Sequence, residues 1–203
     1  MKTNNFIIRI SATVLIAAII SFAFPPFLQA QTTYQISSGK EVTIKVSGKS
    51  NTHDWTMSSS TMESRGEFNF DGQDNLSTLS AFSFNVDAKS LKSGKNTMDN
   101  RTYKSMKADK YPTINYKLNS AVITKVRKNK YLVKSKGDLT IAGSTQAIMM
   151  DLDVVVNADN SISCAGSENL KLTDYNIQPP SFMLGAMKVK NDLNIQFNLL
   201  YKK

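Results

Sequence analysis

The stretch that decides the fold is Leu193-Asn194-Ile195-Gln196-Phe197-Asn198-Leu199-Leu200-Tyr201. Apolar and polar side chains alternate along most of it, so that Leu193, Ile195 and Phe197 fall on one side. Because successive side chains of a β-strand point to opposite faces, a period of two predicts a strand with one apolar face. Strands of this kind are typical of antiparallel sheets that pack a core on one side.

The same alternation recurs through the chain, and short turn sequences separate the runs. The further alternating segments are 42–46, 67–70, 82–86, 114–118 and 148–156. The predicted turns are 71–72, 142–144, 157–160 and 190–192. Many one-faced strands joined by turns predict an all-β chain, either an antiparallel barrel or a sandwich. A barrel leaves no free strand edge, which suits a chain without disulfides.

One segment breaks the alternation. Residues 97–106 contain helix-forming residues and predict a short helix that lies across the sheet or over one barrel end. Thr97 is the expected N-cap, and Asp99 lies near the positive end of the helix. Pro112 is expected to end this region and return the chain to a strand.

The first thirty residues predict an export signal. Lys2 and Arg9 are followed by the apolar run 10–24, by Pro25-Pro26 and by Ala30. This order is typical of a secretory signal peptide cleaved after Ala30, although a retained anchor stays open as an alternative. We therefore expect residues 1–30 to be the signal peptide and residues 31–203 to form one exported domain.

Charge and cysteine content limit the partners. The formal net charge is +9, but the only cluster of basic residues is 125–130, which lies between two alternating runs and reads as a hairpin tip. We therefore expect no nucleic-acid partner. Cys164 is the only cysteine, so an intrachain disulfide is excluded, and we expect this thiol to be a small buried or edge residue.

Catalytic and metal-binding patterns are weak. His53 is the only histidine, and its neighbour Asp54 would point to the opposite face of a strand, so the two do not form a relay. One histidine and one distant cysteine do not supply a zinc site. We expect no enzyme activity, no cofactor and no metal, and a hydrolase that uses His53 is the weakest of three hypotheses.

Four segments, in order, carry a resemblance to one family. These segments are 47–55, 90–94 with 98–99 and 110–114, 137–145, and 173–175 with 179–180 and 184–185. They resemble the YceI-like proteins, exported lipocalin-like barrels of which some bind polyisoprenoids. The resemblance implies an extended antiparallel β-barrel with a short helix near one end and an apolar tunnel. Composition alone leaves open whether the barrel is filled by its own side chains.

The resemblance also implies a ligand and its site. The chain is expected to be a non-catalytic binding protein for a polyisoprenoid or quinone-type lipid, and periplasmic. The expected tunnel residues are Phe68, Phe70, Phe82, Phe84, Met98, Met106, Ile114, Tyr116, Phe182, Met183 and Met187. Arg101 and Tyr103 are the expected contacts of the ligand head group.

The family resemblance also bears on membrane contact and on oligomeric state. Peripheral contact with a membrane is compatible with it, and the protein is expected to be a monomer or a homodimer. The second hypothesis is a cell-envelope interaction module with a filled barrel and no lipid ligand.

Overall fold

The computed structural model describes residues 33–37 and 42–203, apart from the side chain of Met183. Residues 31–203 form one compact unit. The predicted signal peptide, residues 1–30, lies outside the described residues, and so does the end of the predicted mature chain before Thr33. Within the described part, no helix has the length and apolar character needed to cross a bilayer.

The described residues are mostly strand, with one α-helix and three short 3₁₀ helices. The strands are β1 (Thr33–Ile36), β2 (Thr43–Ser50), β3 (Asp54–Ser59), β4 (Glu63–Phe70), β5 (Leu76–Asp87), β6 (Thr113–Arg127), β7 (Lys130–Ile141), β8 (Ser144–Val156), β9 (Ile162–Lys171), β10 (Ser181–Phe182) and β11 (Met187–Lys202). The helices are η1 (Ala88–Ser90), α2 (Asn96–Ser105), η2 (Leu172–Tyr175) and η3 (Met183–Gly185).

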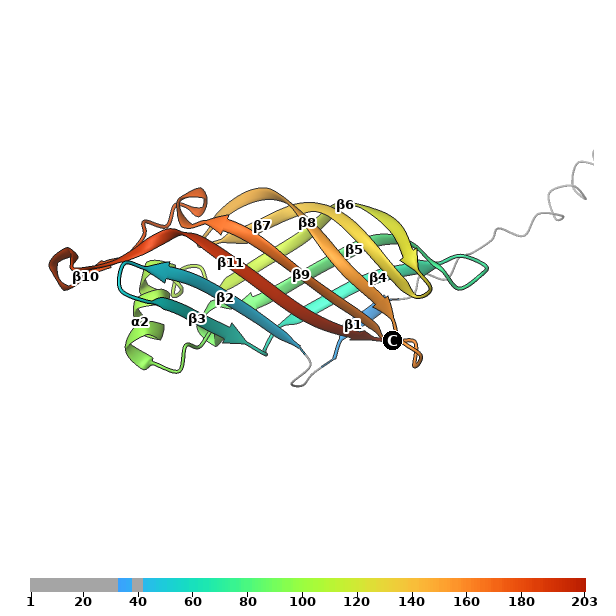
Figure 1. Cartoon of the computed structure of the whole chain (residues 1–203), viewed down its shortest axis with the longest axis horizontal. Helices are drawn as coiled ribbons and strands as arrows, with labels where there is room; N and C mark the ends of the chain where they lie inside the picture. Colours follow the sequence, from blue (N-terminus) through green and yellow to red (C-terminus); the bar gives the residue numbers. More distant parts are fainter. Residues whose placement is uncertain (1–32, 38–41) are drawn as a thin grey trace, which may run out of the picture. The chain divides into compact units, whose positions relative to one another are not determined.

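Eight of these strands close into a ring. The order is β1-β4-β5-β6-β7-β8-β9-β11, and β11 returns to β1. Each of these pairings is antiparallel. The expectation of an all-β, lipocalin-like fold with one short helix is therefore confirmed. The end of β11 meets β1 at one end of the ring, whereas α2 and β10 lie at the other (Figure 1).

The long strand β11 belongs to two different edges. One side of it pairs with β9 from Asp192 to Tyr201. The other side pairs first with β2, from Val189 to Asn198, and then with β1 at Tyr201 and Lys202. The hairpin of β2 and β3 therefore widens the sheet only at the end that carries α2 (Figure 1).

The free edge of β3 is covered by the segment that leads into α2. Ser58 and Lys92 exchange two backbone hydrogen bonds of 2.9 Å each. Exposed strand edges tend to pair with other chains, and this bridge occupies part of the edge of β3. The same bridge places α2 beside the widened end of the sheet.

Three of the four predicted turns are confirmed, and one is wrong. Residues 71–72, 142–144 and 157–160 lie at strand connections, and Lys128-Asn129 forms the predicted basic hairpin tip. The predicted turn at 190–192 is instead part of β11, where the pairing with β2 shifts between Val189 and Leu193. Asn191 explains the difference, because its side chain accepts a bond from the Thr173 N–H and donates one to Thr173 Oγ1.

The helix starts one residue earlier than predicted, and the expected N-cap is wrong. Lys95 precedes α2 and makes no side-chain cap bond, whereas Thr97 lies in the first turn and lines the cavity described below. Asp99 fixes this end instead, accepting bonds from the Ser93 N–H at 2.8 Å and from Ser93 Oγ at 2.6 Å. The Ser93 hydroxyl lowers the pKa of Asp99. As predicted, the chain returns to a strand at Thr113, directly after Pro112.

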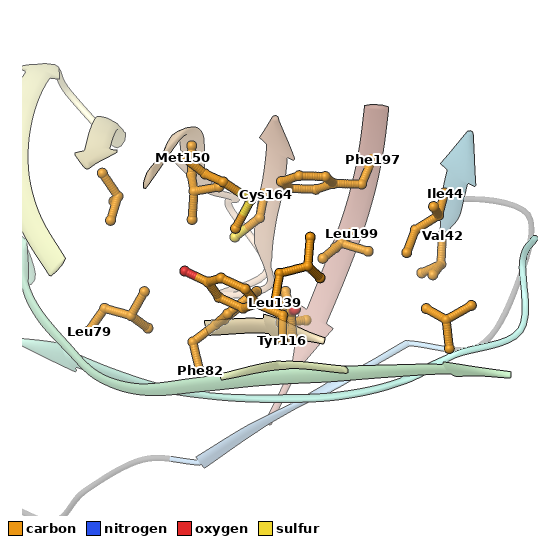
Figure 2. Packing of buried hydrophobic residues seen from close by; sticks show 14 of the residues in the cluster. Val42, Ile44, Leu79, Phe82, Tyr116, Leu139, Met150, Cys164, Phe197 and Leu199 are labelled. Atoms are coloured by element: carbon orange, nitrogen blue, oxygen red, sulfur yellow. The ribbon is translucent and has the colours of Figure 1, made fainter. Parts of the chain in front are cut away.

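The end of the ring near β1 is filled by aromatic side chains. Ring centroids lie 5.5 Å apart for Tyr34 and Phe68, 5.6 Å for Phe68 and Tyr201, 5.9 Å for Phe82 and Tyr201, and 6.1 Å for Phe82 and Tyr116. Such tilted and edge-on pairs stabilise aromatic packing beyond the area they bury. Figure 2 shows Phe82, Tyr116 and Leu199 within this interior. We call this region the closed half.

Buried tyrosine hydroxyls in the closed half have hydrogen-bond partners. The Tyr201 hydroxyl lies 2.6 Å from Ser64 Oγ, which donates to the Ser83 carbonyl at 2.7 Å. The Tyr116 hydroxyl donates to Ser135 Oγ at 3.3 Å. A buried polar group without a partner is destabilising, so these bonds offset the cost of burying the two tyrosine hydroxyls.

Candidate functional site

A cavity begins directly beside the packed residues of the closed half. On five strands, a residue of the closed half is followed two positions away, on the same face, by a residue that lines the cavity. The pairs, with the closed half first, are Val42 and Ile44, Phe82 and Phe84, Tyr116 and Ile114, Leu152 and Met150, and Leu199 and Phe197. We call the region beyond this level the hollow half.

The cavity has a volume of about 840 Å³ and a largely apolar lining. Ligand pockets in proteins span roughly 300–1,000 Å³ and combine apolar walls with a few polar groups. The walls come from most strands of the ring, from β2, β3 and β10, and from α2 and η2. Examples of the apolar lining are Val46, Met57, Val86, Leu139, Ile141, Ile148, Leu170, Leu193 and Ile195.

Glycines at inward-facing positions allow aromatic rings to form the floor. A Cβ added to Gly166 would overlap the ring of Phe197, and one added to Gly137 would overlap the ring of Tyr116. Phe84 lines the cavity and stacks on Tyr116 with centroids 5.4 Å apart. The floor is therefore a layer of rings that lie over glycine backbone.

The helix α2 forms one wall. Met98 and Arg101 line the cavity from this helix, and Met106 lines it from the position directly after the helix. The guanidinium carbon of Arg101 lies 4.4 Å from the centroid of the Phe182 ring, a cation–π contact between α2 and β10. Tyr103 is not among the lining residues, and its hydroxyl donates a bond of 2.6 Å to the Leu91 carbonyl. Tyr103 therefore anchors the helix.

The structure divides the tunnel residues expected from the sequence. Six line the cavity, namely Phe84, Met98, Met106, Ile114, Phe182 and Met187. Phe68, Phe82 and Tyr116 are buried in the closed half, and Phe70 packs against the core from the side. The side chain of Met183 lies outside the described residues. Alternation indicates which face a side chain occupies but not how far along the barrel it lies, and this explains the division.

The sequence alone did not place Trp55, Glu168 and Tyr175 in the lining. Further polar lining residues are Ser50, His53, Asp54, Thr56, Ser93, Lys95, Asn96, Thr97, Thr102, Ser105 and Lys171. The inward-facing positions of β9 are Ile162, Cys164, Gly166, Glu168 and Leu170, so one carboxyl interrupts an otherwise apolar or small series. The inward position of Glu168 can be recognised only once the register of β9 is known. Period two alone does not show that this strand faces a cavity at Glu168.

Two of these polar residues carry buried atoms without a partner. Among residues 33–37 and 42–203, Trp55 Nε1 and the Tyr175 hydroxyl are the buried side-chain polar atoms that lack a hydrogen bond. Burial, together with the charges of Asp174 and Glu168, raises the pKa of Tyr175 to about 12. Burial also raises the pKa of Glu168. The hollow half thus contains polar groups that no other described residue satisfies.

The residues with catalytic potential are placed apart. His53 is exposed, and its Nδ1 lies 2.9 Å from Thr52 Oγ1. Cys164 is buried in the closed half, as expected, and burial raises the pKa of its thiol to about 12. In the part of the chain that the structure describes, no three His, Cys, Asp or Glu side chains gather in a way that could hold a metal ion.

A ring of antiparallel strands with a filled end and an apolar cavity defines a lipocalin-like protein. The chain belongs to the family of YceI-like domains, whose model matches residues 31–201. The resemblance carried by the four sequence segments is therefore confirmed.

Solved structures share this fold at low sequence identity. BcnA from Burkholderia cenocepacia is 18% identical, with a TM-score of 0.62 over 81% of this chain and 98% of that one. A polyisoprenoid-binding domain from Saccharophagus degradans, implicated in plant cell wall breakdown, is 14% identical, with a TM-score of 0.62 over 83% and 97%. A Campylobacter jejuni YceI protein is 20% identical, with a TM-score of 0.52 over 69% and 81%. The comparison with curated proteins found no match.

Proposed function

We propose that this chain is a non-catalytic binding protein that holds a long apolar ligand of the isoprenoid or quinone type in the hollow half. The observation that carries the proposal is the cavity of about 840 Å³ with mainly aliphatic, methionine and aromatic walls. The family and the polyisoprenoid-binding domain from Saccharophagus degradans support the same class of ligand. Export to the periplasm through residues 1–30 is part of this proposal.

Hydrophobic burial suffices for such a ligand. Each CH₂ group transferred from water to an apolar site contributes about 0.8 kcal/mol, so a long chain needs few polar contacts. Met98, Met106 and Met187 add flexible apolar contacts that adapt to an irregular chain. The walls therefore match a hydrocarbon better than they match a compact polar metabolite.

The placement of reactive groups supports a binding role over catalysis. A catalytic histidine needs a nucleophile and an orienting group within hydrogen-bond reach. The ring of His53 contacts Thr52 and is exposed, and the Cys164 thiol lies in the closed half with a raised pKa. A thiol with a pKa of about 12 is almost entirely protonated at neutral pH and is a weak nucleophile.

The filled-barrel hypothesis accounts for only one half of the molecule. Side chains fill the closed half, but the hollow half keeps a cavity of ligand size. The described residues therefore favour a ligand carrier over a module without a ligand. Peripheral contact with a membrane, and a monomeric or dimeric state, stay predictions.

A substitution inside the cavity tests the proposal. Ile114 lines the cavity, so Ile114→Trp places a larger side chain in the volume that the ligand would occupy. Val122 lies on the same strand and is 66% exposed, so Val122→Trp is the matched control. We expect wild type and the control to bind a fluorescent apolar probe saturably, with an isoprenoid lipid displacing it, and Ile114→Trp to bind it at least about tenfold more weakly.

The outcome of this titration decides the proposal. Circular dichroism and thermal unfolding establish that both variants keep the fold. Saturable binding that Ile114→Trp leaves unchanged would show that the probe lies elsewhere. If folded wild type fails to bind apolar probes at all, the carrier role is wrong.

A further inference from the structure

Two polar residues of the cavity wall, Glu168 and Tyr175, come from the end of β9 and from η2. Glu168 lies two residues from Gly166, whose backbone accepts the ring of Phe197. Directly opposite Glu168 on β11 is Ile195, and Leu170 follows on the same face of β9. The carboxyl group therefore lies among apolar neighbours, one inward position above the aromatic floor.

Glu168 also stands where two strands separate. The ladder between β8 and β9 runs from Val156 and Ile162 to Leu152 and Gly166, and it ends there. Beyond this point β9 continues to pair only with β11, and η2 follows directly after β9. The wall around Glu168 is thus formed by β9, β11 and η2.

Tyr175 provides the second polar group at this wall. Its side chain is only 2% exposed, yet its hydroxyl has no hydrogen-bond partner among the described residues. Glu168 lies near enough for its charge to contribute to the raised pKa of Tyr175, after burial and Asp174. No ion pair or side-chain hydrogen bond reaches Glu168 from residues 33–37 or 42–203.

Unpaired polar groups inside an apolar cavity are destabilising unless something binds to them. Leaving a buried donor or acceptor unsatisfied costs about 1–3 kcal/mol, and native structures rarely keep such groups without a reason. In the closed half of the same barrel, Tyr116 and Tyr201 have hydroxyl partners from other strands. Tyr175 differs from them by lining a cavity that can receive a ligand.

We propose that Glu168 and Tyr175 hold the hydroxyl group of a neutral, long-chain isoprenoid alcohol or hydroquinone inside the cavity. This inference rests on the proposed function and adds the polar chemistry of the ligand. A hydroxyl group donates to the Glu168 carboxylate and accepts from the Tyr175 hydroxyl, so one O–H satisfies both residues. The carboxyl group disfavours an anionic phosphate, because a negative charge that enters the cavity beside a half-buried carboxylate meets repulsion in addition to the cost of desolvation.

The head-group contact expected from the sequence gives a different arrangement. Arg101 on α2 would favour an anionic head, held against the helix and Phe182. The two arrangements predict opposite preferences between a neutral and an anionic ligand with the same chain. They can therefore be separated by one competition experiment.

Farnesol and farnesyl phosphate are suitable probes, because they share one hydrocarbon chain and differ in the polar group. Each displaces a bound fluorescent apolar probe from the folded protein at neutral pH. We expect wild type to bind farnesol about tenfold more tightly than farnesyl phosphate, the factor that one charge-dependent contact supplies. Equal affinities, or tighter binding of farnesyl phosphate, would overturn this inference but would leave the proposed carrier function intact.

Two variants identify the residues responsible. Glu168→Gln removes the charge and keeps hydrogen-bonding groups, so we expect farnesol binding to stay within about threefold and the preference over the phosphate to shrink. Tyr175→Phe is expected to weaken farnesol by about fivefold. Asp153→Asn on the exposed face of β8 is the matched charge control and should change neither affinity.

The remaining outcomes are also decisive. A preference for farnesol that Glu168→Gln leaves intact would show that this carboxyl does not discriminate. Tighter binding of farnesyl phosphate that Arg101→Gln abolishes would assign the head group to α2. If neither compound displaces the probe and the probe itself does not bind, the proposed function fails, and the inference fails with it.

Discussion

The closed half and the hollow half are built from the same strands but treat their interior in opposite ways. In the closed half, the ring centroids of Phe68 and Phe82 lie 5.6 and 5.9 Å from that of Tyr201, and the Tyr201 hydroxyl has a partner in Ser64. In the hollow half, Tyr175 and Trp55 keep unpartnered polar atoms beside a cavity of about 840 Å³. One barrel thus separates a region packed by its own side chains from a region that contains a cavity.

The floor between the two halves explains how one sheet can form both a packed interior and a cavity. Gly166 permits the ring of Phe197 to cross the interior at the last level before the closed half. Beyond this level, the β2–β3 hairpin and α2 widen the structure. Packing and an open cavity thus occupy different stretches of the same strands, and the proposed binding uses only one of them.

Truncation of one phenylalanine in each half gives the largest expected contrast. Phe68 is fully buried, so Phe68→Ala should lower the free energy of unfolding by about 3–5 kcal/mol. Phe182 is half-buried at the cavity, and Phe182→Ala should cost about 1 kcal/mol, mainly the contact with Arg101. Urea unfolding of the ligand-free proteins measures both. Equal losses would remove the distinction between the halves.

A methyl group at the floor gives a smaller effect. In Gly166→Ala, the added Cβ would overlap the ring of Phe197, so we expect a loss of about 1–3 kcal/mol. Gly72 has no heavy atom near an added Cβ and provides the control, with Gly72→Ala expected to be close to neutral. Thermal unfolding compares them. A neutral Gly166→Ala would show that the floor is loosely packed.

Removal of one tyrosine hydroxyl from each half tests whether buried hydroxyls are hydrogen-bonded in the closed half and unbonded in the hollow half. Tyr201→Phe deletes the bond to Ser64 and should cost about 1 kcal/mol. Tyr175→Phe deletes a buried hydroxyl that has no partner, so the ligand-free protein should be unchanged or slightly more stable. Chemical denaturation at neutral pH gives both values. A clear loss in Tyr175→Phe would mean that its hydroxyl is satisfied in solution.

Acid should affect the hollow half locally. The pKa of Asp99 is lowered by its bonds to Ser93, so its stabilising contribution is present above the unfolded pKa of about 4 and is lost as the pH falls through the folded value. Trp55 is the only tryptophan and lines the cavity, so its fluorescence reports on this half. We expect a small change below about pH 4 that Asp99→Asn lacks. An identical change in the variant would assign it to another group.

More of the fold than of the candidate site could be predicted from the sequence. Period-two alternation and turn residues indicated an antiparallel all-β chain, and the four family-like segments indicated a lipocalin-like barrel. The turn predicted at 190–192 was wrong because Asn191 bonds to Thr173, a contact across the fold that local sequence does not reveal. Thr97 was wrong as an N-cap because Asp99 and Ser93 fix that end of the helix.

The site was only partly predictable, since its position depends on depth along the barrel. Phe82 and Phe84 have the same alternation, yet the first is packed in the closed half and the second lines the cavity. Nothing in the sequence marks Glu168 as a cavity residue. The register of β9 places it on the inner face of the sheet. Register and strand separation are tertiary properties, and period two carries no information on either.

The most direct test of the hollow half as a ligand cavity is the content of the protein as it is made. The full chain is produced in a host that carries out the proposed export, purified without detergent, and extracted with organic solvent for mass spectrometry. We expect an isoprenoid lipid in roughly equimolar amount in wild type and a much smaller amount in Ile114→Trp, since the larger side chain occupies the cavity. A clean extract from folded wild-type protein would contradict it and would restore the interaction module without a ligand.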